Sequence, residues 1–434
     1  MRLKRENYLK MIRPYYEADL IKVITGVRRA GKSVILESIR DELSESGIPE
    51  DHIVYINLED LDYEGIQTAG QLNDEIKSHI RDSGRYYLFI DEIQHVDKFE
   101  KALASFRATL NASIFVTGSN SQLLSGELAT LLTGRTVEFE ILPFSFSEMG
   151  EWLKLNNRPF QDDQIYDYLK WGGFPLRFDF QDDASIQRYL SNLYTGIINR
   201  DILMKKSRTD RKLFMDIAMY VLSNAGKEFS AESIMEYYEK KNHRSISQRT
   251  IYTYIEKMKK AFLVHPVQKY DIVGKTALQS KQKYYAVDTG LRTVHTNTIN
   301  YEDTFFLENI VYNELLYQGY TVFTGKTYKG EVDFVAIRDG KKCFIQVSYL
   351  LASQSTIDRE FGAFDAIKDA SPKYVLSLDR IDMSQNGIAH IHATQRNRRG
   401  EDVAQRATAG HVAVIHKSLA RYSGSLANVC ENSA

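Results

Sequence analysis

Residues 26–33 read Gly26-Val27-Arg28-Arg29-Ala30-Gly31-Lys32-Ser33 and match the phosphate-loop pattern G-x-x-x-x-G-K-[ST]. A short apolar stretch precedes this octapeptide, and apolar residues at helical spacing follow it, so strand, loop and helix come in the required order. The loop would surround phosphate oxygens with backbone N–H groups, Lys32 would reach the β- and γ-phosphates, and the Ser33 hydroxyl would ligate Mg²⁺. Arg28 and Arg29 could contact phosphates or face solvent. The alternative interpretation is a glycine turn that only caps a helix.

A second motif follows at residues 86–92, which read Tyr86-Tyr87-Leu88-Phe89-Ile90-Asp91-Glu92. The apolar run suits a strand buried on both faces of a parallel sheet, and the two carboxylates come at its carboxyl end, where such sheets bind ligands. This arrangement is typical of a Walker B element. Asp91 would hold Mg²⁺ through its water shell, and Glu92 would orient the attacking water. A strand that ends in a solvated acidic turn is the alternative.

Between residues 1 and 145, short apolar segments alternate with helical stretches, which predicts the parallel α/β sheet of a P-loop NTPase. The expected strands are 21–25, 53–58, 86–90, 114–117 and 137–142. The fourth ends in small polar residues, so Asn120 or Ser119 could sense the γ-phosphate or simply cap the next helix. Arg135, just before the fifth strand, could stabilise the transferred phosphoryl group in its own subunit or in a neighbouring one, or could form a surface salt bridge.

The composition is that of a folded protein with several domains, because 434 residues exceed one typical core and 43% of them are hydrophobic. The net charge of −1 means that any nucleic-acid surface must be local. The two cysteines exclude a disulfide framework, and no apolar run has the length of a membrane span. We therefore expect a cytoplasmic protein that does not enter a membrane.

After the ATPase core we expect a helical lid over 146–205, interrupted by a hinge-like Trp171-Gly172-Gly173-Phe174-Pro175, and a winged helix over 206–298. The winged helix would contain a basic patch, with seven cations against one acid, Glu256: Lys240, Lys241, Arg244, Arg249, Lys257, Lys259 and Lys260. Such a patch could neutralise the phosphates of double-stranded DNA. It could also be an ordinary solvated face on a domain that binds another protein.

A second α/β unit is expected over 299–385. The spacing of Glu308, Glu331-x-Asp333 and Gln346-x-Ser348 resembles the metal site of restriction-endonuclease-like nucleases, in which two acids hold Mg²⁺ and a lysine activates water. Ser348 stands where that lysine would be, which argues against nuclease chemistry. Residues 386–434 lack an apolar period and are expected to form a poorly ordered tail.

With these motifs together, residues 1–385 resemble a family of prokaryotic AAA-type P-loop ATPases that carry a winged helix and a degenerate restriction-endonuclease-like domain of unknown function. Further motifs that carry the resemblance are Leu142-Pro143-Phe144-Ser145-Phe146-Ser147-Glu148 and Tyr285-Ala286-Val287-Asp288-Thr289-Gly290-Leu291. The resemblance implies adenine as the base. It also implies that the last domain has a binding or architectural role.

The leading hypothesis is therefore an enzyme that binds and hydrolyses Mg·ATP and couples this to DNA. The alternatives are an ATP-switched module for binding a protein partner, with slow hydrolysis, and an ATP-dependent nuclease that uses Glu308, Glu331 and Asp333. A trans-acting Arg135 would require a homo-oligomer.

Overall fold

The computed structural model describes residues 2–119, 132–203, 209–242, 245–294 and 304–394. The chain divides into two compact units. The first contains Met1–Phe160, Tyr166–Pro266 and Tyr284–Ile299, and the second contains the remaining segments. Asn120 of the expected sensor, Arg244 of the basic patch and the chain beyond residue 394 lie outside the described residues.

The first unit is built on a five-stranded parallel sheet in the order β2-β3-β4-β1-β5. Its strands are β1 (Ile21–Thr25), β2 (Ile53–Asn57), β3 (Tyr86–Asp91), β4 (Ala112–Thr117) and β5 (Thr136–Glu140). β1, β3 and nearly all of β4 are buried on both faces, as their continuous apolar runs predict. The P-loop NTPase fold expected from the sequence is confirmed.

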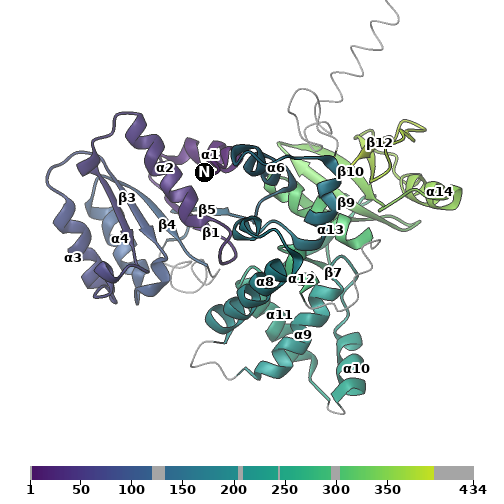
Figure 1. Cartoon of the computed structure of the whole chain (residues 1–434), viewed down its shortest axis with the longest axis horizontal. Helices are drawn as coiled ribbons and strands as arrows, with labels where there is room; N and C mark the ends of the chain where they lie inside the picture. Colours follow the sequence, from purple (N-terminus) through teal and green to yellow (C-terminus); the bar gives the residue numbers. More distant parts are fainter. Residues whose placement is uncertain (1, 120–131, 204–208, 243–244, 295–303, 395–434) are drawn as a thin grey trace, which may run out of the picture. The chain divides into compact units, whose positions relative to one another are not determined.

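Helices cover both faces of this sheet (Figure 1). Helices α3 (Ala69–His79) and α4 (Phe99–Thr109) pack on each other and bury apolar side chains with Leu88 and Ile90 of β3. Phe89, between those two residues, points to the opposite face and stacks on Phe115, and α2 (Lys32–Glu45) contacts β3 and β4 there. The short helix α1 (Glu6–Ile12) lies against α2. These layers fix the loops at the carboxyl edge of the sheet.

The segment expected to form the lid contains α6 (Phe146–Leu155), α7 (Ile165–Trp171) and α8 (Asp183–Ile197), and α8 ends in a π-helical turn, η8 (Ile198–Ile202). The 3-10 helix η7 (Pro175–Asp179) lies between α7 and α8.

The Gly172-Gly173 turn interrupts the helices between α7 and η7, as expected, and hydrogen bonds hold it in place. Phe144 donates its N–H to the Gly173 carbonyl at 2.8 Å, and Gly173 donates its N–H to the Asp288 carboxylate at 2.6 Å. A Cβ on Gly173 would lie 1.9 Å from the Phe144 oxygen, so only glycine fits this approach.

Three helices follow the lid, α9 (Arg211–Ser223), α10 (Ala231–Asn242) and α11 (Gln248–Lys260). The strands β6 (Val264–Asp271) and β7 (Thr276–Ala286) come next, and then the short helix α12 (Thr289–Thr293). Residues 267–283, the distal part of these two strands, belong to the second unit. A hairpin built into a larger sheet has less backbone free to act as a wing on DNA.

The second unit contains a mixed sheet in the order β12-β11-β10-β9-β8-β6-β7. Its later elements are α13 (Thr304–Tyr317), β8 (Thr321–Lys326), β9 (Glu331–Arg338), β10 (Lys341–Val347), α14 (Gln354–Gly362), β11 (Lys373–Ser377) and β12 (Ala389–His392). β12 pairs in parallel with β11, so the sheet continues past the boundary expected at residue 385. The sequence concealed this strand because only Ile391 on it is a large aliphatic residue.

Candidate nucleotide-binding site

The phosphate loop connects β1 to α2 and has the backbone conformation that its glycines allow. Gly26 has a φ of 131°, and a Cβ there would lie 2.2 Å from the Ile141 carbonyl oxygen. Gly31 has a φ of 98° and forms the N-cap of α2. The loop therefore directs the amino end of α2, with its free N–H groups, toward the carboxyl edge of the sheet. Val27 and Ala30 are fully buried beneath it, whereas Arg29 is exposed.

Lys32 is the buried cation of this loop. Its ammonium donates to the carbonyl oxygens of Gly26 at 3.2 Å and Val27 at 3.4 Å. Burial lowers the pKa of Lys32, and the nearby carboxylates of Glu92, Asp201 and Asp91 oppose that shift. An ammonium that is desolvated in this way gains strongly from a phosphate anion, because the two charges would interact in a poorly screened environment.

Asp91 and Glu92 lie at the carboxyl end of β3. Thr117 at the end of β4 connects them, because its hydroxyl donates to Asp91 while accepting the Glu92 N–H at 2.9 Å. The Tyr55 hydroxyl also donates to Asp91, at 3.4 Å. Glu92 has a φ of 55°, which is uncommon for a residue with a side chain, and Gln94 donates to its carboxylate. These contacts give both carboxylates defined positions.

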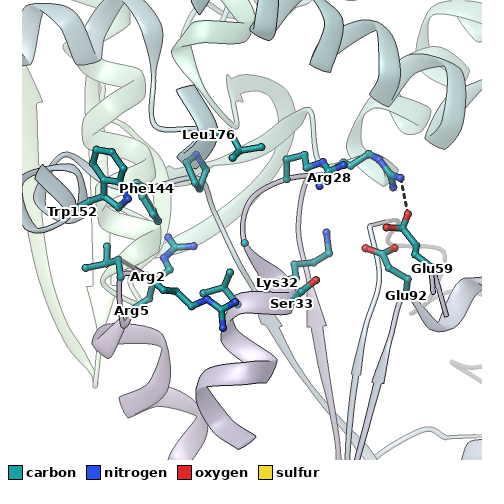
Figure 2. Close-up of a pocket in the computed structure, with 15 residues that line it drawn as sticks. Arg2, Arg5, Arg28, Lys32, Ser33, Glu59, Glu92, Phe144, Trp152 and Leu176 are labelled. Carbon is teal, nitrogen blue, oxygen red and sulfur yellow. Dashed lines mark hydrogen bonds and ion pairs between the residues drawn. The ribbon is translucent and has the colours of Figure 1, made fainter. Parts of the chain in front are cut away.

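A cavity of about 330 Å³ opens beside the phosphate loop (Figure 2). Lys32, Ser33, Glu59 and Glu92 lie at one side of it. The other side carries the apolar residues Leu3, Phe144, Trp152, Pro175 and Leu176, together with Arg2 and Arg5 (Figure 2). A polar end next to an apolar end suits a ligand that has a polyphosphate and a planar base.

Arg28 points along the polar side and donates to Glu59 at 2.9 Å (Figure 2). Arg28 is therefore paired and mostly buried, and does not simply face solvent. It remains at the cavity wall, within the loop that would bind phosphate.

Arg5 holds the phosphate loop in place through buried contacts, a role that was not predicted from the sequence. Its guanidinium forms two hydrogen bonds with Glu148, at 2.7 and 2.6 Å, and donates to the Ala30 carbonyl at 3.0 Å. Arg5 and Glu148 are each only 1% exposed. Glu148 also completes the capping box of α6 with Ser145. One buried ion pair therefore ties α1, the phosphate loop and the first lid helix together.

Arg135 lies at the wrong edge of the sheet to serve its own site. Its carbonyl accepts the Ile21 N–H at 2.9 Å, at the amino ends of β1 and β5, whereas the phosphate loop follows the carboxyl end of β1. Five residues of strand separate the two edges, about 16 Å at 3.3 Å per residue. Its exposed side chain leaves a role in a neighbouring subunit as the remaining catalytic hypothesis.

The lid contributes a carboxylate that the sequence analysis missed, Asp201 of η8. The Ser119 hydroxyl donates to it at 3.4 Å, and it interacts electrostatically with Arg28, Lys32 and Glu92. Its only sequence signal was a charged pair, Arg200-Asp201, within an apolar helical run.

The acidic cluster in the second unit that resembles a nuclease metal site holds a lysine from another strand. Lys283 of β7 contacts Glu308 at 3.3 Å and Glu331 at 2.7 Å, and these acids raise its pKa. Asp333 accepts the Val347 N–H at 2.8 Å, and burial together with Glu308 raises its pKa well above the ordinary value. An ammonium between the carboxylates neutralises the site internally, which disfavours a divalent cation there.

Within the described residues, no cluster of three or more His, Cys, Asp or Glu side chains is arranged to hold a metal ion. A P-loop site does not need such a cluster, because Mg²⁺ is held there mainly by a hydroxyl, phosphate oxygens and water. Ser33 at the start of α2 and Asp91 at the end of β3 supply the donor types that this arrangement requires. Among the described residues, no helix combines the length and apolarity needed to cross a membrane.

Two segments of the chain match known protein families. Residues 18–150 match a family described as an AAA domain, and residues 162–301 match a domain of unknown function, DUF8612. The second match begins after α6 and runs from α7 through α12.

An uncharacterized protein of Haemophilus influenzae is 36% identical over 351 residues, which cover 80% of this chain and 87% of the relative. The uncharacterized protein MJ1544 of Methanocaldococcus jannaschii is 32% identical over 398 residues, covering 88% and 84% of the two chains.

Two solved structures show weaker similarity. The Walker-type ATPase PABY2304 of Pyrococcus abyssi has 17% identity and a TM-score of 0.49, covering 68% of this chain and 96% of that one. The ORC1 protein of Aeropyrum pernix, solved in complex with DNA, has 13% identity and a TM-score of 0.29, covering 68% and 92%.

The phosphate loop, the parallel sheet and the matched AAA domain define an AAA-type P-loop ATPase domain with a nucleotide-binding site. The chain as a whole belongs to the family that includes the Haemophilus influenzae protein and MJ1544.

Proposed function

We propose that this protein binds Mg·ATP, hydrolyses it, and couples hydrolysis to double-stranded DNA. The observation that carries the hydrolysis proposal is the meeting of Lys32 and Ser33 with Glu92 at one cavity wall, next to Asp91. The base would lie against Phe144, Trp152 and Leu176, because aromatic and apolar surfaces stack on purines. Adenine is favoured because the chain has no Asn/Thr-Lys-x-Asp motif for reading guanine after β4.

Each residue has a defined role in this proposal. Lys32 binds β- and γ-phosphate oxygens, and the N–H groups at the start of α2 hold the rest of the polyphosphate. When bound, Mg²⁺ would neutralise negative charge on those oxygens, and Ser33 and Asp91 are the residues that would hold it. Glu92 orients the attacking water and accepts its proton. Thr117 and Gln94 keep the acidic side chains in place.

DNA would bind along α11, where Arg249 and Tyr252 are exposed and Lys259 and Lys260 are half-buried. These cations would neutralise backbone phosphates, so the contribution of DNA should weaken with salt. Asn120 and Arg135 would complete the catalytic site, the second from a neighbouring subunit, if the protein assembles.

A protein partner is the second candidate, and the surface of α10 favours it. Its exposed residues include Glu232, Glu236 and Glu239, which would repel DNA phosphates next to the basic patch. Within that patch, Lys257 donates to Thr209 and Lys259 pairs with Glu256 at 2.7 Å, so both ammonium groups are already engaged.

The test is ATP hydrolysis by the full-length protein with and without double-stranded DNA, over a salt series. Lys32→Ala should abolish activity, and Glu92→Gln should retain ATP binding while hydrolysis falls about 100-fold or more. Stimulation by DNA that fades with salt would support DNA coupling, whereas indifference to DNA would favour the protein partner. Wild-type hydrolysis in Lys32→Ala would overturn the assignment of the site.

A further inference from the structure

The π-helical turn η8 places an acidic side chain against the residues that would bind phosphate. Asp201 lies in this turn and is mostly buried, with the Ser119 hydroxyl donating to it at 3.4 Å. Lys32 and Arg28 attract its charge, and Glu92 repels it. Ser119 and Glu92 follow β4 and β3, on the side of the loop where the terminal phosphate would lie.

A second contact ties the same turn to the phosphate loop. Glu59 accepts a hydrogen bond from Arg28 at 2.9 Å and lies 4.0 Å from the guanidinium of Arg200, the neighbour of Asp201. The turn is therefore linked to Arg28 both directly, through the charge of Asp201, and indirectly, through Glu59.

A carboxylate that is buried in this way lowers the stability of the fold, which argues against a purely structural role for Asp201. Burial raises the pKa of Asp201 to about 6, which means that the ionised form is disfavoured by its surroundings. Short π-helical segments are rare and occur frequently at functional sites. The cations that compensate this carboxylate are the ones that a polyphosphate would also require.

We propose that Asp201 senses the terminal phosphate of the nucleotide, because it competes with that phosphate for Lys32 and Arg28. ATP then binds with full affinity only when η8 moves away from the phosphate loop or when Asp201 is protonated. ADP lacks the terminal phosphate that this carboxylate would repel. Since η8 lies in the chain between α8 and α9, its movement would pass the nucleotide state to the three helices that follow. The inference rests on the proposed nucleotide site, but it requires neither hydrolysis nor DNA.

The proposal gives ATP affinity a defined dependence on pH. The charged and polar groups that face Asp201 are Arg28 and Lys32 of the phosphate loop, Glu92 after β3, and Ser119 after β4. Protonation removes the repulsion between Asp201 and the terminal phosphate, so ATP affinity should rise as pH falls through about 6. At pH 7.5 such a group is neutral in about 3% of molecules, so its removal could increase affinity by up to about 30-fold.

The experiment is isothermal titration of the full-length protein with Mg·AMPPNP and Mg·ADP between pH 5.5 and 8. Asp201→Asn removes the charge with little change in size. At each pH, the affinity of the variant is divided by the affinity of the wild type. This ratio removes the effect of protonation of the nucleotide, which is the same for both proteins. We expect Asp201→Asn to bind AMPPNP at least 10-fold more tightly at pH 7.5, with the ratio falling toward 1 at pH 5.5 and a smaller gain for ADP.

Three further variants keep the test decisive. Asp201→Glu retains the charge and should behave as wild type. Asp201→Ser provides a second neutral side chain if Asp201→Asn does not fold. Asp179→Asn removes a charge from an exposed position elsewhere in the lid and should leave affinity unchanged.

Equal affinities of wild type and Asp201→Asn for AMPPNP would overturn the inference and leave the proposed function intact. A fall in kcat of Asp201→Asn with unchanged affinity would also overturn it, because Asp201 would then act in the chemical step. Failure of the wild type to bind either nucleotide would instead remove the proposed function, and this inference with it.

Discussion

Replacing Arg5 with methionine should destabilise the first unit and weaken nucleotide binding. Arg5 and Glu148 are each 1% exposed, and the variant would leave the Glu148 carboxylate buried without its cation. Loss of one partner from a buried ion pair typically costs 3–5 kcal/mol, about the range expected here. The Ala30 carbonyl would lose its hydrogen bond as well, so the phosphate loop should become less ordered.

A double-mutant cycle separates the ion pair from the packing of Arg5. Glu148→Gln alone should be destabilising by a similar amount, because the guanidinium is then left without its counter-ion. The double variant, Arg5→Met with Glu148→Gln, should recover at least about 2 kcal/mol relative to the sum of the single effects. Glutamine can still serve the capping box with Ser145, so the start of α6 should remain intact.

The assay is urea denaturation followed by tryptophan fluorescence. Trp152 and Trp171 are the two tryptophans of the chain, and both lie in lid helices. Single variants that lose less than about 1 kcal/mol, or a double variant whose loss equals the sum of the single losses, would refute the reasoning.

Three further predictions concern packing and charge. Gly173→Ala should lower the melting temperature because its Cβ would lie 1.9 Å from the Phe144 oxygen, whereas Gly70→Ala in α3 meets no atom within 4 Å and should be neutral or stabilising. Lys22→Met should stabilise the protein by about 1–4 kcal/mol near pH 7, since burial lowers the pKa of Lys22 to about 7 and the unfolded chain binds the proton more tightly. The stability gained by Lys22→Met should shrink toward pH 10. A gain that grows with pH in denaturation curves would contradict a lowered pKa of Lys22. Lys283→Met should destabilise the second unit by about 2 kcal/mol or more in urea denaturation followed by circular dichroism, since both tryptophans lie in the first unit, and millimolar Mn²⁺ should restore part of the loss if Glu308 and Glu331 then accept a cation.

β1, β2, β3 and β4 could be predicted from the sequence because each contains a short apolar run, and parallel pairing then brings Asp91 and Glu92 to the same edge as Lys32. The same rule also places Arg135 at the opposite edge, since it precedes its strand, so the sequence alone already favoured a neighbouring subunit over its own as the site where Arg135 could act. The spacing of the phosphate-loop pattern was enough by itself to predict Gly31 and Ser33 as residues of the nucleotide site.

The missed residues share a different property, which is that their partners lie far away in the sequence. Arg5 meets Glu148 across 143 positions, and Asp201 meets Ser119 across 82. Lys283 enters the acidic cluster from a strand expected to belong to another domain. No local periodicity reports such contacts, because each charged residue resembles a surface residue until the fold brings its counter-ion to it.

The bridge between Arg5 and Glu148 also constrains the order in which the nascent chain can mature. A ribosome adds about 5–20 residues per second, so the amino-terminal helix waits for many seconds before its counter-ion is synthesised. Until Glu148 has left the exit tunnel, Arg5 lacks its carboxylate counter-ion, and the phosphate loop lacks the contact through α6. The sheet and the first lid helix must therefore reach their final state as one co-translational unit, and a nascent chain stalled at residue 145 should be far more sensitive to protease than one stalled well beyond α6.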